Sequence, residues 1–176
     1  MKLALSTWPE GTKTREFEES DESLGLDKDL YRFSEPIKVN LTVHKASNEV
    51  IIEGRVGTTA YADCVRCLED VAMTVDETFR RVASIVPDAQ VSEDSGDPDF
   101  TFLPESQPEW DLTEPLREIV MLALPDNPLC REDCQGLCPI CGANRNQESC
   151  NCNGAAGRTP LAQLGELLDQ HRKNGS

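Results

Sequence analysis

The sequence predicts an α+β protein from three observations. Apolar and polar residues alternate over 37–44, apolar residues recur with a helical period over 112–123, and six cysteines lie within 130–152. We expect an antiparallel β meander, closing into a barrel-like sheet and packed with one main helix. A C-terminal zinc-knuckle segment and a short terminal helix follow it. The length of 176 residues allows one domain with a small appendage.

Three extended stretches joined by short turns predict the meander. The first stretch places four apolar residues on one face: Ile37, Val39, Leu41 and Val43. The second covers 49–64 and contains Gly54 and Gly57, which suggest a bulge or a close backbone approach. The third covers 71–86. Residues 1–35 are acidic and weakly patterned, so we expect a loop with a short helix there.

One amphipathic helix is expected between residues 111 and 125. Five apolar residues fall on one of its faces: Leu112, Leu116, Ile119, Val120 and Ala123. Asp111 or Thr113 can cap its start, and Pro125 ends it.

The remaining segments set the expected domain organisation. Residues 88–111 hold eight acidic residues and no basic one, so we expect a long acidic loop, with a short strand at 100–103. A terminal helix is expected with Thr159 as its cap and Pro160 as its first residue. The chain then divides into an acidic β-rich domain with one helix, 1–129, and a cysteine-rich zinc segment with the terminal helix, 130–176. We expect the two to pack as one structural unit.

Negative charge is concentrated in the first part of the chain. The net charge is −15, and residues 130–176 carry five basic and five acidic side chains, so residues 1–129 hold 12 basic and 27 acidic ones. Nucleic-acid-binding proteins usually carry a basic surface. An acidic body instead suits basic partner proteins, or serves solubility. No signal peptide, transit peptide or membrane-spanning stretch is visible, so we expect a cytoplasmic protein with no membrane partner.

The strongest chemical signal is the motif CPICG at 138–142. In the cytoplasm, clustered cysteines are more often metal ligands than disulfides. Two thiolates three residues apart can bind one metal from a tight turn, and a second pair follows after eight residues. Four thiolates suit tetrahedral structural zinc. We therefore expect a zinc site formed by Cys138, Cys141, Cys150 and Cys152.

Four cysteines remain: Cys64, Cys67, Cys130 and Cys134. The simplest grouping makes them a second four-cysteine zinc site, because CVRC at 64–67 repeats the two-residue gap at a turn. Several alternatives stay open: a single site within 130–152 with some thiols free, CVRC as buried core thiols, iron–sulfur ligation, and disulfides. Zinc is favoured over iron because the spacing gives two tetrahedral sets and matches no ferredoxin pattern.

No catalytic constellation is visible, so we expect no enzyme and no small-molecule substrate. Two closed four-thiolate sites leave no open coordination position for a water or a substrate. The only histidines are His44 and His171, and the chain has no Ser–His–Asp set, phosphate-binding glycine loop or HExxH motif.

Three segments in a fixed order carry a family resemblance: CVRCLE at 64–69, DLTEPLREIVMLALPDNPLC at 111–130, and DCQGLCPICGANRNQESCNC at 133–152. Together they resemble the YceD-like family, described as large ribosomal RNA subunit accumulation proteins. The resemblance implies a role in synthesis, processing or stability of large-subunit ribosomal RNA, without a known enzymatic activity. It places Cys64 and Cys67 at the family's strand-turn pair and Cys130 at its metal-type residue after the helix. Where the family has Asp-Pro-Arg, this chain has RTPLAQL at 158–164.

The leading hypothesis is a non-catalytic zinc-binding factor in ribosome biogenesis. Its partner would be the pre-ribosomal large-subunit particle, through ribosomal RNA or a basic ribosomal protein. The candidate phosphate contacts are four arginines that we expect to be exposed: Arg66, Arg80, Arg81 and Arg145. One alternative is a redox- or zinc-responsive switch, in which oxidation ejects zinc. Another is a zinc-ribbon adaptor for the transcription machinery, which would bind polymerase instead.

Overall fold

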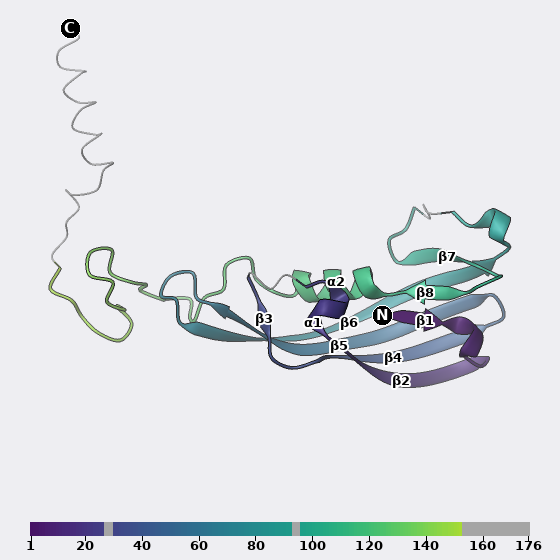
Figure 1. Ribbon diagram of the computed structural model, residues 1–176, viewed down its shortest axis with the longest axis horizontal. Coiled ribbons are helices and arrows are strands. Elements are labelled where there is room, and N and C mark those ends of the chain that lie inside the picture. Colours follow the sequence, from purple (N-terminus) through teal and green to yellow (C-terminus); the bar gives the residue numbers. More distant parts are fainter. Residues whose placement is uncertain (27–29, 93–95, 153–176) are drawn as a thin grey trace, which may run out of the picture. The chain divides into compact units, whose positions relative to one another are not determined.

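The computed structural model describes residues 1–26, 30–92 and 96–152, and these residues belong to two compact units (Figure 1). Of the described residues, the first unit comprises those in 1–62 and 70–128, and the second comprises 63–69 and 129–152. The domain boundary expected between residues 129 and 130 stays a prediction. The terminal helix expected from Thr159 lies outside the described residues. No helix within the described residues is long and apolar enough to span a bilayer.

The first unit is built on a six-stranded sheet in which β2, β4, β5, β6 and β7 are neighbours in that order and β3 pairs with β5. The bounds are β2 Gly11–Glu19, β3 Arg32–Phe33, β4 Ile37–Ala46, β5 Glu49–Asp63, β6 Asp70–Val86 and β7 Phe100–Pro104. β4 is antiparallel to β2 and β5, whereas β7 is parallel to β6. A separate antiparallel pair joins β1 (Lys2–Ala4) to β8 (Glu109–Asp111). Among the described residues the large sheet is open at β2 and β7. The sheet-dominated class is therefore confirmed, but the barrel-like closure is not.

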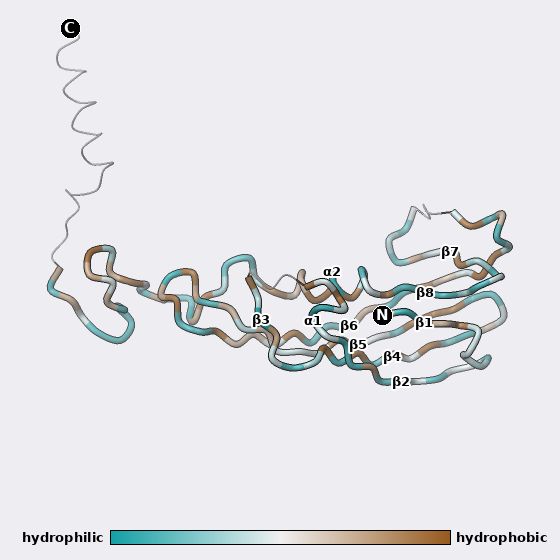
Figure 2. The backbone as a smooth tube through the Cα atoms, viewed as in Figure 1, coloured by the Kyte–Doolittle hydropathy of each residue, from teal (hydrophilic) through white to brown (hydrophobic). Residues whose placement is uncertain are grey.

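The alternation predicted for β4 gives the sheet its buried face. Its four apolar residues are at most 1% exposed: Ile37, Val39, Leu41 and Val43. On β5, Gly54 lies opposite Leu41 of β4. The Phe79 ring occupies the place that a side chain at Gly54 would need. The close approach at Gly54 is therefore made by side chains and not by backbone, and at Gly57 an added Cβ would meet only the Val75 carbonyl oxygen, at the ordinary contact distance of 3.9 Å. Figure 2 shows apolar positions interspersed with hydrophilic ones along these strands.

The main helix, α2 (Thr113–Leu122), lies within the predicted range, but its N-cap is Leu112 rather than Asp111 or Thr113, and it ends before Pro125. The Thr113 N–H donates to Asp111 Oδ1 at 2.9 Å, which satisfies a backbone donor of the first turn. Leu116 and Val120 are buried, and α2 packs against β6 and against α1 (Asp21–Leu24). Two short 3-10 helices, η1 (Leu5–Thr7) and η2 (Asp88–Gln90), complete the described elements of the first unit. The short helix predicted before residue 35 corresponds to α1, and the short strand predicted at 100–103 corresponds to β7.

The prediction of a loop for most of residues 1–35 is wrong, because β2 is a nine-residue edge strand there. Its side chains are exposed or only partly buried, so its sequence carries no alternation of apolar and polar residues, and Figure 2 shows it mostly hydrophilic or neutral. Its backbone pairs with β4 from Gly11 opposite Lys45 to Glu19 opposite Ile37. This strand therefore depends on a partner distant in sequence, and its own residues do not reveal it.

Candidate metal centres

The motif CVRCLE forms a tight turn at residues 64–69. The Cys64 N–H donates to the Glu69 carbonyl at 2.8 Å, and the Leu68 N–H donates to the Cys64 carbonyl at 2.9 Å. Leu68 adopts a left-handed backbone with a φ of 60°. Cys64 is 0% exposed and Cys67 is 4% exposed, so the turn directs both sulfurs inward.

Residues 138–143 repeat this turn with a different sequence, CPICGA. The Cys138 N–H donates to the Ala143 carbonyl at 2.8 Å, and the Gly142 N–H donates to the Cys138 carbonyl at 2.9 Å. Gly142 has a φ of 75° and stands at the place that Leu68 takes in the first turn. Only glycine adopts this backbone without a steric cost. The two turns thus share one backbone geometry, although only their cysteines are identical.

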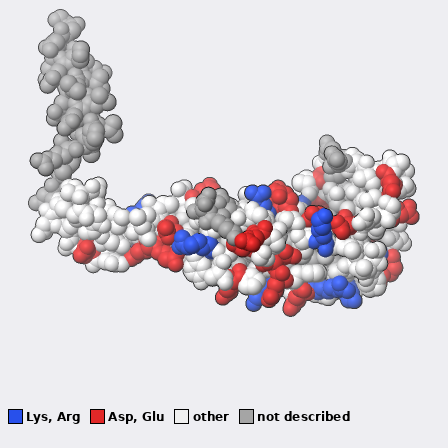
Figure 3. Space-filling model, in the orientation of Figure 1, with Lys and Arg blue, Asp and Glu red and all other residues white. Residues whose placement is uncertain are grey.

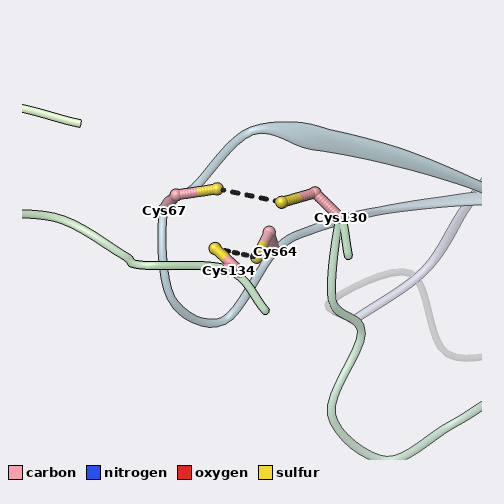
Figure 4. A group of neighbouring side chains, drawn as sticks. All are labelled: Cys64, Cys67, Cys130 and Cys134. Carbon is pink, nitrogen blue, oxygen red and sulfur yellow. Dashed lines mark hydrogen bonds between the residues drawn. The ribbon is translucent and has the colours of Figure 1, made fainter. Parts of the chain in front are cut away.

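The eight cysteines form two clusters, which are the two groups of four that the sequence predicts. The first cluster consists of Cys64, Cys67, Cys130 and Cys134, and the second of Cys138, Cys141, Cys150 and Cys152. Within each cluster all four sulfurs lie within 4.8 Å of one another. In the first cluster, shown in Figure 4, Cys64 and Cys134 present their sulfurs 3.8 Å apart, and Cys67 and Cys130 present theirs 3.5 Å apart. A tetrahedral zinc with bonds of 2.3 Å separates its sulfur ligands by about 3.8 Å, so the spacing of these sulfurs fits zinc.

Among the described residues of the second unit, no apolar core is present. The only buried residues there are four cysteines and one glycine: Cys64, Cys67, Cys134, Cys138 and Gly136. Leu68 and Ile140 are instead 64% and 54% exposed. Residues with so little buried apolar area cannot offset the conformational entropy of folding. The sulfur clusters therefore occupy the position that a hydrophobic core has in an ordinary domain.

Backbone groups around the first cluster stabilise thiolate at selected positions. Burial raises the pKa of Cys64, but hydrogen bonds from neighbouring backbone groups, that of Cys130 first, outweigh it and lower the pKa to about 6. Burial likewise raises the pKa of Cys134, and the Asn146 amide and other donors outweigh it, so the net direction is downward. A backbone hydrogen bond from Glu69 lowers the pKa of Cys67, but burial and the neighbouring thiols raise it to about 12. Each ionised sulfur thus opposes ionisation of the next one, and a divalent cation would remove this repulsion.

The second cluster follows the same physical rule. Hydrogen bonds from the backbone of Cys141 and Ile140 lower the pKa of Cys138 to about 6, although burial opposes them. A hydrogen bond with Cys141, together with burial, raises the pKa of Cys152 to about 12. The Arg145 guanidinium lies 3.8 Å from Cys138 Sγ and adds positive charge beside this sulfur, whose pKa is lowered.

Two residues that the sequence analysis did not single out hold the clusters in place. Gly136 has a φ of 69°, and a Cβ there would lie 3.0 Å from the Arg66 carbonyl oxygen. Asn146 donates from Nδ2 to Cys134 Sγ at 3.2 Å. A glycine between two cysteine pairs could have indicated a left-handed turn. The sequence around Asn146 carries no comparable signal, because its contact depends on how the chain folds back.

The four arginines expected to contact phosphate have different surroundings. Arg81 is the exception to the prediction of exposure, because its side chain is only 15% exposed and pairs with Asp99 at 3.1 Å. Arg66 donates to the Cys134 carbonyl at 3.0 Å while staying exposed. Arg80 and Arg145 are exposed as well. On the face drawn in Figure 3, acidic side chains surround the basic ones, so no broad basic surface is visible there.

One family model matches this chain, and it is the family that the three cysteine-containing segments resemble. The model described as "Large ribosomal RNA subunit accumulation protein YceD" matches residues 52–168. The chain belongs to the YceD family. The matched range contains all eight cysteines and α2, so the YceD match includes both candidate metal centres.

Individual relatives cover the chain to different extents. An uncharacterized protein of Mycobacterium tuberculosis is 31% identical over 106 residues, which is 60% of this chain and 50% of the relative. The proteins named "Large ribosomal RNA subunit accumulation protein YCED homolog 1, chloroplastic" are more distant. The one from Arabidopsis thaliana is 26% identical, covering 84% of this chain and 54% of the relative, and the one from Zea mays is 25% identical, covering 72% and 52%. The chain thus spans about half the length of the curated relatives it matches. No solved structure matches it.

Proposed function

We propose that this YceD-family chain is a non-catalytic zinc-binding factor that supports the accumulation of large-subunit ribosomal RNA. The observation that carries the proposal is the family match over residues 52–168, which spans both cysteine clusters. Two relatives that align with 84% and 72% of this chain bear the name of large ribosomal RNA subunit accumulation proteins. The role assigned to this chain is in synthesis, processing or stability of that RNA.

Each cluster is proposed to hold one zinc ion through its four cysteines. The first site would use Cys64, Cys67, Cys130 and Cys134, and the second would use Cys138, Cys141, Cys150 and Cys152. When bound, zinc supplies a structural crosslink between segments distant in the sequence. Four protein ligands leave no coordination position for a substrate, so this zinc has no catalytic role. The sulfur separations of 3.5 and 3.8 Å in the first cluster support this assignment.

The proposed partner is the pre-ribosomal large-subunit particle in the cytoplasm. Residues 1–129 carry 27 acidic and 12 basic side chains, which favours contact with a basic ribosomal protein over broad contact with RNA phosphates. Arg66, Arg80 and Arg145 are the exposed arginines that a local RNA contact would use. Binding to a basic protein should weaken steeply as salt is added, because exposed charges are screened.

The function can be tested in cells that carry a tagged copy of the chain. Lysate is separated on a density gradient, and the fractions are probed for the protein and for precursor and mature ribosomal RNA, with and without the gene. We expect comigration with large-subunit precursors and loss of large-subunit RNA on deletion. The unmodified chain should rescue the deletion. The double variant Cys64→Ser with Cys67→Ser should not rescue it, whereas the control variant Ser84→Ala should. Protein that stays at the top of the gradient, with ribosomal RNA unchanged, would refute the proposal.

A redox- or zinc-responsive switch is the second candidate, and the short sulfur separations favour it because neighbouring thiols can oxidise to disulfides once metal leaves. A switch requires accessible thiols, yet Cys64 is 0% exposed. Slow reaction of the metal-loaded protein with thiol reagents would count against the switch.

Recovery of polymerase rather than ribosomal particles with the tagged protein would favour an adaptor for transcription.

A further inference from the structure

The side chain of Asn146 contacts the first cluster from a loop that lies between two cysteines of the second. Its Nδ2 donates to Cys134 Sγ, a member of the first cluster, at 3.2 Å, and its Oδ1 accepts from the Gln135 N–H at 2.7 Å. Nδ2 also lies 2.9 Å from Asn144 Oδ1, which fixes the orientation of the amide. Asn146 therefore positions both the Cys134 sulfur and the backbone beside it.

The loop that carries Asn146 belongs to the second cluster. Eight residues, 142–149, separate Cys141 from Cys150, and both of these cysteines are in that cluster. The Arg145 N–H donates to the Gly136 carbonyl at 3.0 Å, and Asn144 forms an antiparallel bridge with Leu137. These bonds hold the loop along the segment that joins the two clusters.

Adjacent residues of this loop donate to different clusters. Arg145 donates from Nη2 to Cys138 Sγ at 3.8 Å, and Asn146 donates to Cys134 Sγ at 3.2 Å. A metal bound at the second cluster would join the two ends of the loop, which lowers the entropy lost when the loop becomes ordered. In the ordered loop the Asn146 amide lies beside Cys134, a ligand of the first cluster.

We propose that Asn146 is a positioning residue that makes metal binding at the first cluster depend on metal binding at the second. The inference rests on the zinc binding proposed above. Groups that hydrogen-bond to metal ligands commonly change metal affinity 10- to 100-fold. A hydrogen bond from a neutral amide to a thiolate is stronger than one between neutral groups. Because coupling of two binding sites is reciprocal, the first cluster strengthens the second by the same factor.

The test uses zinc and the full chain, with amide NMR signals as separate reporters of the clusters. Residues 64–68 report the first cluster and residues 138–142 report the second, while a chelator competes for the metal. Asn146→Asp keeps the size of the side chain but replaces the donor with a negative oxygen. We expect it to weaken zinc binding at the first cluster roughly 10- to 100-fold. The matched control is Asn40→Asp on β4, which should leave the affinity of both clusters unchanged.

A double variant separates coupling from a merely local effect. Cys150→Ser with Cys152→Ser disables the second cluster and should weaken the first cluster by a similar factor, roughly 10- to 100-fold. Adding Asn146→Asp to that variant should then produce no further loss, since the loop is no longer ordered. The coupling would be refuted if Asn146→Asp caused an equal further loss of zinc affinity in that variant. It would also be refuted if the Asn146→Asp protein bound zinc at the first cluster with full affinity. In either case two bound zinc ions would still support the proposed function. If the unmodified chain bound no zinc, the proposed zinc site and this inference would both fail.

Discussion

Gly136 lies where two segments of the second unit meet, and replacing it tests how the first cluster is assembled. Its φ is 69°, and a Cβ would lie 3.0 Å from the Arg66 carbonyl oxygen. That oxygen accepts from the Leu137 N–H at 3.0 Å. Gly136→Ala should therefore push the turn that carries Arg66 away from the segment that carries Cys134. The cysteines of the first cluster would lose their spacing.

The magnitude follows from two separate costs. Alanine in a left-handed backbone costs roughly 1 kcal/mol more than glycine. Loss of the hydrogen bond between Leu137 and Arg66 adds about 1 kcal/mol. Because this segment lacks an apolar core, its folding is coupled to metal binding, and the strain appears as weaker binding. A total of about 2 kcal/mol corresponds to a roughly 30-fold loss of zinc affinity at the first cluster.

Gly142→Ala is the matched control, because Gly142 has a φ of 75° but no atom within 4 Å of its added Cβ. It incurs the backbone cost alone, so the second cluster should lose only about fivefold in affinity. The assay is competition between a chelator and the protein, followed by the amide signals of 64–68 and 138–142. If Gly136→Ala costs no more than Gly142→Ala, the contact with the Arg66 carbonyl does not hold the first cluster together.

Three further predictions concern the two units separately. Metal removal by a chelator should collapse the amide signals of residues 130–152 while the sheet signals stay dispersed; an unchanged spectrum for 130–152 would contradict a metal-dependent fold. Gly54→Val should lower the free energy of unfolding in urea by about 1–3 kcal/mol, because the new side chain collides with the Phe79 ring. Arg55 donates to Asp76 at 2.6 Å and lowers the pKa of that carboxyl below its ordinary 3.8. Stability from this pair is present above a pH of about 4 and is lost as the pH falls through the lowered pKa. The difference in Tm between the unmodified protein and Asp76→Asn should accordingly shrink as the pH falls, and a constant difference would refute the assignment.

The grouping of the cysteines shows how far spacing alone can predict a site. Zinc in a closed site takes four ligands, and the motif at 138–142 with the pair after it uses four of the eight cysteines. The simplest grouping then places the remaining four together, although Cys130 lies 63 positions after Cys67. The spacing was also compatible with other arrangements of the cysteines: a single site, buried thiols, or disulfides. The sulfur positions favour two groups of four.

By itself the sequence determined the elements whose signal is local: the alternation of β4, the apolar face of α2, and the cysteine turns at 64–69 and 138–143. Each depends on periodicity or on turn chemistry within a few residues. Only the tertiary structure decided the contacts between distant segments. Among these are the edge strand β2, the parallel pairing of β7, the pairing of Arg81 with Asp99, and the Asn146 amide beside Cys134. Such contacts depend on which segments meet, and no local period or composition encodes that meeting.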